Sequence, residues 1–451
     1  MTTIDQLKSA NAMFQWHPMA HPKAMQSQRP DIIARGKGVY VWDIDGHQLL
    51  DGVAGLWSSN LGHSCQAVRD AVVAQLDELP FFNTFRGTTH PKAIELSRDL
   101  VNLMSPDGVR AVMFSNGGSD AVEGALKLAR QYFKLKGQGD RTKYISLRQG
   151  YHGVHFGGAS VNGNSNFRRA YEPLLPGCFH IDTPWTYRNP FTEDPIELGK
   201  ICATLLEREI QFQGADTIAA FIAEPIQGAG GVIVPPSNYW PLIREVCDKY
   251  GVLLIADEVV TGFGRTGEMF GTRLWGVQAD MWCLAKGITS GYIPMGATAI
   301  GEKLSEAFLN DSTGMGAITH GYTYSAHPVA AAAAVATLKE LEARQIPRHV
   351  AEVGSAFQAR LRKLQAHPLV GEVRGHGLML CIDMVADKVK RTPLPKSNDF
   401  PQRVARRCYE NGLMVRISGN NLILSPPLIL TMGEMDELCT RLEFAFSALQ
   451  A

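Results

Sequence analysis

Polar residues that can carry charge or act as nucleophiles stand directly after short apolar runs of this sequence. Asp257 and Glu258 follow the run VLLIA, and Lys286 follows the run MWCLA. A carboxylate is costly to bury without a cationic or hydrogen-bonding partner. The pattern therefore predicts either a buried ion pair between Asp257 and Lys286 or a site in which both groups hold a ligand.

A glycine-rich segment, Asn116-Gly117-Gly118-Ser119-Asp120, lies between another apolar run and a predicted helix. Glycines let the backbone approach an anion closely, and the first amides of a helix point at it. The same residue types are also common in tight turns that merely cap helices. We interpret Gly118 and Ser119 as a phosphate-binding turn, with a plain helix cap as the alternative.

Two further polar segments, Gly150-Tyr151-His152-Gly153 and Glu224-Pro225, also follow apolar runs. The set then contains a lysine that can form a Schiff base, an acid, a phosphate-binding turn and an aromatic ring. Pyridoxal 5′-phosphate needs these four groups, because the acid keeps its pyridine nitrogen protonated and the ring stacks on it. The residues therefore predict a pyridoxal phosphate site.

A competing motif is the run Gly262-Phe-Gly264-Arg-Thr-Gly267, a literal GxGxxG that follows a strand, with Asp280 further on. In nicotinamide-binding proteins such a run opens a helix, and an acid at the end of the next strand binds the ribose. Here the residues after the run have no helical periodicity, and Asp280 precedes a strand. We therefore keep nicotinamide binding only as the least favoured alternative.

The elements that must position these residues are short apolar strands that alternate with helices. Val122, Leu126, Ala129 and Phe133 recur at helical spacing and predict a helix over 119–135. The predicted strands are 111–114, 143–147, 219–223, 252–256 and 281–285. Such alternation predicts an α/β fold with a mostly parallel sheet, in which ligands bind beyond the carboxyl ends of the strands.

The two ends of the chain have a different sequence pattern. Residues 39–50 alternate apolar and polar side chains around Asp45-Gly46 and predict a hairpin in an otherwise irregular N-terminal arm. Past Pro328, two helical stretches precede three short strands and a last helix from about residue 432. This pattern predicts a second, smaller α+β domain, with the five alanines of 330–334 as a close-packed helix face.

Composition excludes several classes of protein. The 451 residues carry 44 Lys+Arg and 44 Asp+Glu, so the net charge is zero, without the positive excess of nucleic-acid or membrane-surface binders. The eight cysteines form no CxxC pair, and the sequence has neither a signal-peptide pattern nor a long apolar stretch. We expect a cytoplasmic protein with no metal site, no membrane span and no nucleic-acid partner.

Several ordered motifs resemble the class III pyridoxal-phosphate aminotransferases, specifically the ω-amino acid or amine:pyruvate transaminases. The likeness runs from about residue 10 to the C-terminus and is carried by LLIADEVVTGFGRTGEMFG, LAKGITSGYIPMGA, AFIAEPIQGAGGVIVPP, GYHG and HGYTYSAHPVAAA. The resemblance implies fold type I, the aspartate aminotransferase-like architecture. It also implies pyridoxal 5′-phosphate as cofactor and explains GFGRTG as a loop of the family.

The resemblance assigns roles at the cofactor. Lys286 matches the Schiff-base lysine that also moves the proton, Asp257 the partner of the pyridinium nitrogen, and Tyr151 the ring that stacks on the cofactor. These three residues are the expected catalytic set. The expected cofactor-binding residues are Gly118, Ser119, Tyr151, Glu224, Asp257, Val259, Lys286 and Thr323, the last from a neighbouring subunit.

The resemblance also places a substrate pocket around Trp57, Phe85 and Arg416, the last of which would bind a carboxylate. Met19 stands where several amine transaminases have an aromatic residue, and Arg86 where an aromatic or neutral residue is common. Arg86 suggests a donor with a distal anion, such as β-alanine or taurine, because a guanidinium pairs well with carboxylate or sulfonate. The alternatives are core packing for Trp57, a surface ion pair for Arg416 and exposure to solvent for Arg86.

We therefore expect a transaminase that moves an amino group from an ω-amino acid, taurine, a diamine or an arylalkyl amine to pyruvate by a ping-pong mechanism. Other class III reactions, namely those of an aminomutase, a decarboxylase, a racemase or a 2-oxoglutarate-dependent aminotransferase, use the same lysine and aspartate. A cofactor-binding module without catalysis and a nicotinamide oxidoreductase are the remaining alternatives. The expected assembly is a homodimer or a tetramer. The expected division of the chain is an N-terminal segment (1–60) that joins the small domain, a large cofactor domain (61–328) and a C-terminal small domain (329–451).

Overall fold

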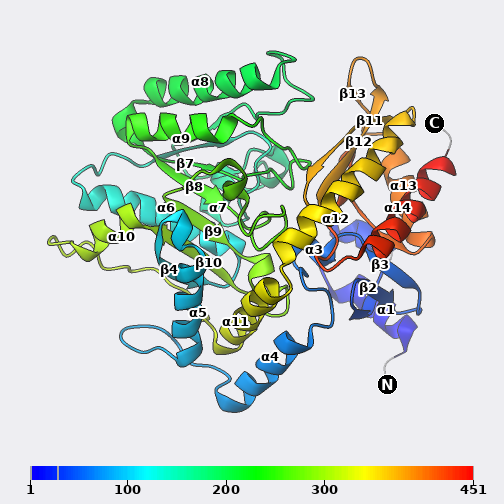
Figure 1. The fold of residues 1–451 in the computed structure, drawn as a ribbon, viewed down its shortest axis with the longest axis horizontal. Helices are drawn as coiled ribbons and strands as arrows, with labels where there is room; N and C mark the ends of the chain where they lie inside the picture. Colours follow the sequence, from blue (N-terminus) through cyan, green and yellow to red (C-terminus); the bar gives the residue numbers. More distant parts are fainter. Residues whose placement is uncertain (1–2, 28–29, 450–451) are drawn as a thin grey trace.

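The computed structural model describes residues 3–27 and 30–449. A seven-stranded sheet forms the larger part of the molecule (Figure 1). Across the sheet the strands are β4 (Val109–Ser115), β10 (Gly296–Gly301), β9 (Met281–Leu284), β8 (Leu253–Asp257), β7 (Ile218–Ala223), β5 (Lys143–Leu147) and β6 (Cys178–Ile181). Only β10 is antiparallel to its neighbours. The predicted mostly parallel sheet is confirmed, and β10 and β6 are strands that the sequence pattern did not reveal.

Helices cover both faces of this sheet. Leu253 and Ile255 of β8 pack in one buried cluster with α6 (Gly118–Leu135), whereas the intervening Leu254 and Ala256 belong to the main cluster on the other face. That other face is covered by α9 (Tyr239–Tyr250), and α8 (Pro195–Gln213) packs on α9. A strand that is buried on both faces must be apolar throughout, which is why β8 reads as a continuous apolar run.

The remaining helices of this part close its edges. They are α4 (Gln66–Glu78), α5 (Pro91–Leu103), α7 (Phe156–Val161), α10 (Glu302–Leu309) and α11 (Pro328–Ala343). All five alanines of 330–334 are buried, and α11 contacts α4, α5 and the short helix η5 (Lys286–Thr289). The predicted close-packed alanine face is therefore present, and it packs against the turn that begins with Lys286.

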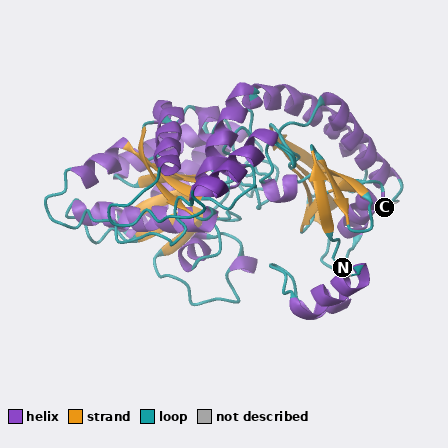
Figure 2. Cartoon of the chain, turned by 90° about the horizontal axis from the view of Figure 1, so that it is seen from below, coloured by secondary structure: helices purple, strands orange, loops and turns teal. Residues whose placement is uncertain are grey.

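A second group of strands lies beside the large sheet, with its own helices (Figure 2). One sheet has the order β1 (Ile33–Lys37), β2 (Tyr40–Asp43), β3 (Gln48–Asp51) and β14 (Leu413–Met414). The other has the order β11 (Val370–His376), β12 (Met379–Asp387), β16 (Asn421–Leu424) and β15 (Arg416–Ser418), and β13 (Thr392–Pro393) pairs with β12. The helices here are α12 (Ile346–Leu361), α13 (Phe400–Glu410) and α14 (Met432–Ser447). Because β14 pairs with β3, the two ends of the chain share one sheet.

The N-terminal arm is more ordered than the sequence pattern indicated. The predicted hairpin is present as antiparallel β2 and β3, with Gly46 at φ +90° in the turn. The arm before it was expected to be irregular, but it contains α1 (Ile4–Phe14) and α2 (Pro22–Ser27). The expectation missed the capping box of α1, in which Thr3 and Gln6 each bond the other's backbone amide.

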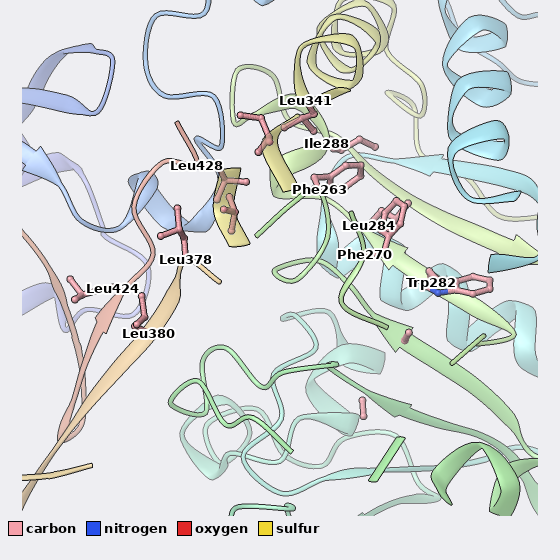
Figure 3. Close-up of a cluster of buried hydrophobic side chains, with 14 of the residues drawn as sticks. Phe263, Phe270, Trp282, Leu284, Ile288, Leu341, Leu378, Leu380, Leu424 and Leu428 are labelled. Atoms are coloured by element: carbon pink, nitrogen blue, oxygen red, sulfur yellow. The ribbon is translucent and has the colours of Figure 1, made fainter. Parts of the chain in front are cut away.

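The GFGRTG run does not open a helix, which removes the structural basis of the nicotinamide alternative. Residues after Asp257 continue through turns to the short helix η4 (Gly271–Trp275). Phe263 and Phe270 of this loop are fully buried, and they belong to the core that joins the two strand groups (Figure 3). The other short helices are η1 (Ser105–Asp107), η2 (Ser165–Phe167), η3 (Ala215–Thr217) and η6 (Arg362–Ala366). Across the residues that the structure describes, we find no helix with the length and apolarity needed to cross a bilayer.

Candidate active site

Three strand ends bring the predicted acid and amine to one edge of the large sheet. Asp257 is the last residue of β8, Glu224 follows β7, and Lys286 follows β9. β8 is parallel to both neighbours, and Asp257 pairs with Cys283 in the register of β9. The carboxyl ends of these strands therefore point the same way, as ligand binding at the edge of an open α/β sheet requires.

Lys286 begins the short helix η5 with a left-handed backbone conformation, at φ +46°. Burial lowers the pKa of its amine below the ordinary value, and the positive charge of Arg416 acts in the same direction, whereas Asp257 and Glu224 oppose the shift. Within the described part of the chain the amine takes part in no ion pair. An amine with a lowered pKa is more often neutral, and it is therefore a better nucleophile for a carbonyl group.

Asp257 is buried and held in one orientation. Its Oδ2 accepts a hydrogen bond from Nδ1 of His152 at 2.8 Å, and its Oδ1 accepts one from the amide of Val259 at 3.2 Å. Since the carboxylate can only accept, this contact requires the His152 tautomer or charge state with a proton on Nδ1. The sequence motif Gly150-Tyr151-His152-Gly153 predicted no function for His152. The spacing of residues along the chain does not reveal that residues 152 and 257 are in contact.

The neighbouring Glu258 points elsewhere. Its carboxylate accepts hydrogen bonds from the hydroxyl of Thr261 and from the amides of Gly271 and Thr272, at 2.8 and 2.7 Å for the amides. Burial raises the pKa of Glu258, and these hydrogen bonds oppose that shift. Of the two adjacent acids, Asp257 therefore faces the candidate site and Glu258 holds the loop behind it.

Glu224 fixes the segment that carries Tyr151. One carboxylate oxygen accepts from the amide of Tyr151 at 2.9 Å, and the other accepts from the amide of Gly228 at 2.7 Å. Burial raises the pKa of Glu224 to about 7, with a further contribution from Asp257 and an opposing one from His152. The Tyr151 ring meets Phe167 edge to face, with ring centroids 4.9 Å apart. The acid thus holds the backbone of the aromatic residue.

Gly118 and Ser119 open α6, where the first amides have no partner within the helix. The Ser119 hydroxyl oxygen accepts a hydrogen bond from the amide of Val154 at 3.1 Å. A Cβ on Gly118 would come within 2.9 Å of Val259, so this turn and the residue after Asp257–Glu258 are packed together. The helix N-terminus therefore adjoins the segment that carries Asp257, and it can receive an anion there.

Trp57 and Arg416 lie at the junction of the two strand groups. Trp57 is buried in a small cluster with Ile226, Val232, Met379, Cys381 and Ile423. Arg416, the first residue of β15, is partly buried, which lowers the pKa of its guanidinium, and the shift is opposed by Tyr151. No carboxylate among the described residues forms an ion pair with Arg416. The surface ion pair that was the alternative for Arg416 is therefore not present.

The other predicted site residues are exposed and lie apart from Lys286 in the single chain. Phe85 packs against Gly321, where a Cβ would lie 3.2 Å from the ring, and both line a cavity of about 690 Å³ with Arg86. Thr323 follows in the same loop and is exposed. Met19 is 71% exposed in the turn between α1 and α2. Phe85 and Arg86 thus share a face with the loop of Thr323, and the described contacts join none of these four residues to Lys286.

The residues at the sheet edge fit pyridoxal 5′-phosphate. The unpaired amine of Lys286 can react with an aldehyde, and the oriented carboxylate of Asp257 can pair with a protonated ring nitrogen. The free amides at the start of α6 suit a phosphate group. Among the described residues the Lys286 amine has no ion pair to break, and the Asp257 carboxylate contacts His152 through Oδ2 alone.

Comparison with known proteins agrees with this geometry. The model of the family described as "Aminotransferase class-III" matches residues 23–446. The chain belongs to the class III aminotransferases. The resemblance read from the motifs is therefore confirmed, and so are fold type I and the dependence on pyridoxal 5′-phosphate.

Individual relatives of this class III aminotransferase cover almost the whole chain. It is 40% identical over 424 residues to the putrescine–pyruvate aminotransferase of Pseudomonas aeruginosa, covering 94% of this chain and 92% of the relative. It is 37% identical to gamma-aminobutyrate transaminase 1, mitochondrial, of Oryza sativa subsp. indica, covering 94% and 83%. Among solved structures, an amine transaminase from an uncultivated Pseudomonas species in the PLP-bound (internal aldimine) form is 50% identical, with a TM-score of 0.95 over 97% of this chain and 99% of that one.

Proposed function

We propose that this class III aminotransferase transfers the amino group of a primary ω-amine to pyruvate, which yields alanine and an aldehyde or ketone. The observation that carries the proposal is the partly buried amine of Lys286, which forms no ion pair among the described residues, together with the oriented carboxylate of Asp257. The choice of pyruvate and an amine rests on the 40% identity to a putrescine–pyruvate aminotransferase and on the likeness to amine transaminase structures.

In this proposal Lys286 is the group that binds the cofactor and moves a proton at the reacting carbon. Its lowered pKa leaves more of the amine in the neutral form, which is the form that can accept that proton. Asp257 keeps the ring nitrogen protonated, while Tyr151 and Val259 lie against the ring, and Gly118 and Ser119 bind the phosphate. Bound pyridoxal 5′-phosphate supplies the carbonyl group that amines engage and the ring that withdraws electrons from the reacting carbon.

Arg416 is the proposed binding group for the carboxylate of pyruvate. Its guanidinium has no carboxylate of its own to satisfy among the described residues, and it is close enough to Lys286 to influence the pKa of that amine. A planar guanidinium binds a carboxylate through two parallel hydrogen bonds. Trp57, on the same side, is the proposed wall of the pocket for the apolar part of the donor.

The active unit in this proposal is a homodimer, with a tetramer as a further possibility. Thr323, Phe85, Arg86 and Met19 are exposed in the single chain, and the resemblance assigns all of them to the site. Large apolar side chains are exposed around Phe85, Arg86 and the loop of Thr323, namely Phe81, Phe82, Ile94, Ile318 and Tyr324. A second copy that covers this face would bury them and bring the four site residues to its own Lys286.

Two further proposals concern the organisation and location of the chain. The division into residues 1–60, 61–328 and 329–451 is supported by the pairing of β14 with β3, which joins the first and last segments in one sheet. A cytoplasmic location is supported by the eight cysteines, all of which are free thiols in the structure.

The test is a panel of donors assayed for alanine formation from pyruvate: putrescine, β-alanine, taurine and 1-phenylethylamine. We expect turnover with at least one donor, no turnover without a keto acid, and a higher rate with pyruvate than with 2-oxoglutarate. Turnover without a keto acid would instead support an aminomutase or a decarboxylase. In Arg86→Ala, we expect kcat/KM to fall for β-alanine and taurine and to stay unchanged for 1-phenylethylamine, whereas an equal change for all donors would exclude Arg86 as an anion-binding group.

A further inference from the structure

Arg265, in the GFGRTG loop, is a fully buried arginine that forms no ion pair with a carboxylate among the residues described. Its guanidinium donates hydrogen bonds to the carbonyl oxygens of Leu378 and Pro426, at 3.0 and 2.5 Å, and to the side-chain oxygen of Asn60 at 3.0 Å. Burial lowers the pKa of Arg265 to about 9, and the charge of Asp51 opposes that shift. A buried charge with only neutral acceptors is expensive, which indicates that its geometry has a purpose beyond packing.

The three acceptors come from distant parts of the chain. Asn60 follows the N-terminal strands, Leu378 lies in the turn between β11 and β12, and Pro426 follows β16. The guanidinium therefore joins the loop after β8 to both segments that build the second group of strands. The core at this place is continuous, and Phe263, Ile288 and Leu428 all belong to it (Figure 3). A planar fork presents five donors in fixed directions and can reach three such segments at once, whereas a lysine presents its three donors from a single nitrogen and an apolar side chain presents none.

Asn60 is fixed by its hydrogen bonds. Its oxygen accepts from Arg265, and its amide nitrogen donates to the carbonyl oxygen of Phe263 at 3.0 Å. Because arginine can only donate and a carbonyl can only accept, the orientation of the amide group is determined by its partners. The backbone oxygen of Asn60 also accepts from the amide of Leu428 at 2.8 Å. The residue is 1% exposed, so no water competes for these bonds.

The segment around Asn60 covers the turn that contains Lys286. A Cβ on Gly287 would lie 2.5 Å from the Asn60 amide nitrogen, so any larger residue after the lysine would have to displace the Asn60 side chain. At the other end of the turn, the amide of Leu61 donates to the hydroxyl of Ser290 at 2.8 Å. Lys286 and Ser290 both have left-handed backbones, at φ +46° and +52°. Left-handed conformations cost energy in residues other than glycine and persist only where the surroundings hold them.

We propose that Asn60 and Arg265 are positioning residues that hold the Lys286–Ser290 turn, including the left-handed backbones of Lys286 and Ser290 at its two ends, and thereby set the direction of the Lys286 amine. The proposal rests on the proposed role of Lys286. The proposal also gives a reason for the many segments that Arg265 joins. Trp57 lies in the same short segment as Asn60 and packs on the second group of strands. The segment that contains Trp57 and Asn60 therefore supports both the proposed pocket wall and the turn that contains Lys286.

The test compares Asn60→Ala and Arg265→Lys with two matched controls. Arg141→Lys is the control for the arginine, because Arg141 likewise donates to three neutral oxygens, the carbonyls of Ile218, Tyr250 and Gly251, and burial also lowers its pKa. Asn238→Ala is the control for the asparagine, because its amide donates to the carbonyl of Ile196 between α8 and α9. Neither control residue contacts the lysine turn among the described residues.

The main readout is the pH titration of the visible absorbance of the lysine-bound cofactor in the purified holoenzyme. We expect its midpoint to shift by about half a pH unit or more in both test variants and to stay at the wild-type value in both controls. We also expect kcat to fall about 10-fold, with KM for pyruvate within about twofold of the wild-type value, because the error is in the direction of a reacting group. Thermal unfolding of each variant separates this effect from a general loss of stability.

A further variant keeps the test decisive if Arg265→Lys does not fold. Gly287→Ala places a methyl group against the amide of Asn60 and, at 3.0 Å, against the Cβ of Phe263, and Asn60→Ala removes the first and closer of these contacts. We expect the double variant to recover part of the kcat that Gly287→Ala loses. Wild-type titration midpoints in Asn60→Ala, or strictly independent effects of Asn60→Ala and Gly287→Ala, would overturn the positioning role.

The failure of this proposal differs from the failure of the proposed function. Lys286→Ala is expected to abolish turnover and the visible absorbance, whereas Lys143→Ala, at the opposite end of the sheet, is expected to retain both. If Lys286→Ala keeps both signals, the role of Lys286 itself is wrong. If it loses them while Asn60→Ala titrates as the wild type does, only the positioning role is wrong.

Discussion

At the scale of single residues, Arg416 is the proposed contact for the acceptor, and its effect can be separated from that of the lysine. We expect Arg416→Ala to lower kcat/KM for pyruvate by about 10-fold to 100-fold, because a charge-assisted bidentate contact is lost. The same variant should leave kcat/KM for propanal, an acceptor of similar size without a carboxylate, nearly unchanged. The measurement is the rate of amination of each acceptor with one fixed donor. An equal loss for both acceptors would mean that Arg416 supports the pocket and does not bind the carboxylate.

The protonation of Glu224 is expected to make the stability of the folded chain depend on pH, because burial raises the pKa of Glu224 from 4.5 to about 7. The folded apoenzyme then binds this proton more tightly than the unfolded chain does. The stabilisation is fully present below about pH 4.5 and is lost as the pH rises through 7. We expect the infrared band of a protonated carboxyl group at pH 6 in the wild-type apoenzyme and its absence in Glu224→Gln. A wild-type spectrum at pH 6 without this band would show that the two backbone amides keep Glu224 ionised.

At the scale of elements, the start of α6 offers a matched pair of glycines. A Cβ on Gly118 would meet the branched side chain of Val259 at 2.9 Å, whereas a Cβ on Gly117 meets nothing within 4 Å and its backbone is extended at φ −177°. We expect Gly118→Ala to weaken binding of pyridoxal 5′-phosphate by about 10-fold through overpacking, and Gly117→Ala to leave it unchanged. Equilibrium titration of the apoenzyme with the cofactor measures both. Equal affinities in the two variants would show that Val259 can move aside without cost.

The elements that could be predicted from the sequence are those whose burial leaves a pattern. The strands β7, β8 and β9 are almost entirely apolar because both faces of the sheet are covered, so their ends, and with them Asp257 and Lys286, could be located in advance. The strand β10 contains two glycines and two alanines among its six residues, and it forms only because β4 and β9 lie on either side of it. Such a strand has no pattern of its own.

The same distinction holds at the candidate site. The residue types predicted a cofactor with an amine, an acid and a phosphate turn, and the family match confirms the cofactor. The contact of His152 with Asp257, the hold of Glu224 on Tyr151 and the contact of Asn60 with Arg265 join residues that are 73 to 205 positions apart. Long-range hydrogen bonds of this kind depend on how strands are ordered in the sheet, which spacing along the chain does not encode.

At the scale of the whole molecule, the predicted site residues fall into two groups that lie apart in the single chain. Lys286, Asp257 and the start of α6 lie at the edge of the large sheet, while Thr323, Phe85 and Arg86 are exposed beside a cavity of about 690 Å³. A two-fold dimer can join each group to the complementary group of the other copy, because a two-fold interface presents the same surface on both subunits. Each site would then depend on both chains.

Mixed dimers test this arrangement directly. Lys286→Ala removes the amine from its own chain, and Thr323→Asp places a negative charge where the partner's phosphate is proposed to bind, so each homodimer should be inactive. In a dimer of one chain of each kind, one site carries both changes and the other carries neither. Random pairing of equal amounts should therefore restore about a quarter of the wild-type activity, because half of the dimers are mixed and each has one intact site. If Thr323 instead contributes to the site of its own chain, the mixture should be inactive. In that case no site would combine an intact lysine with an intact threonine.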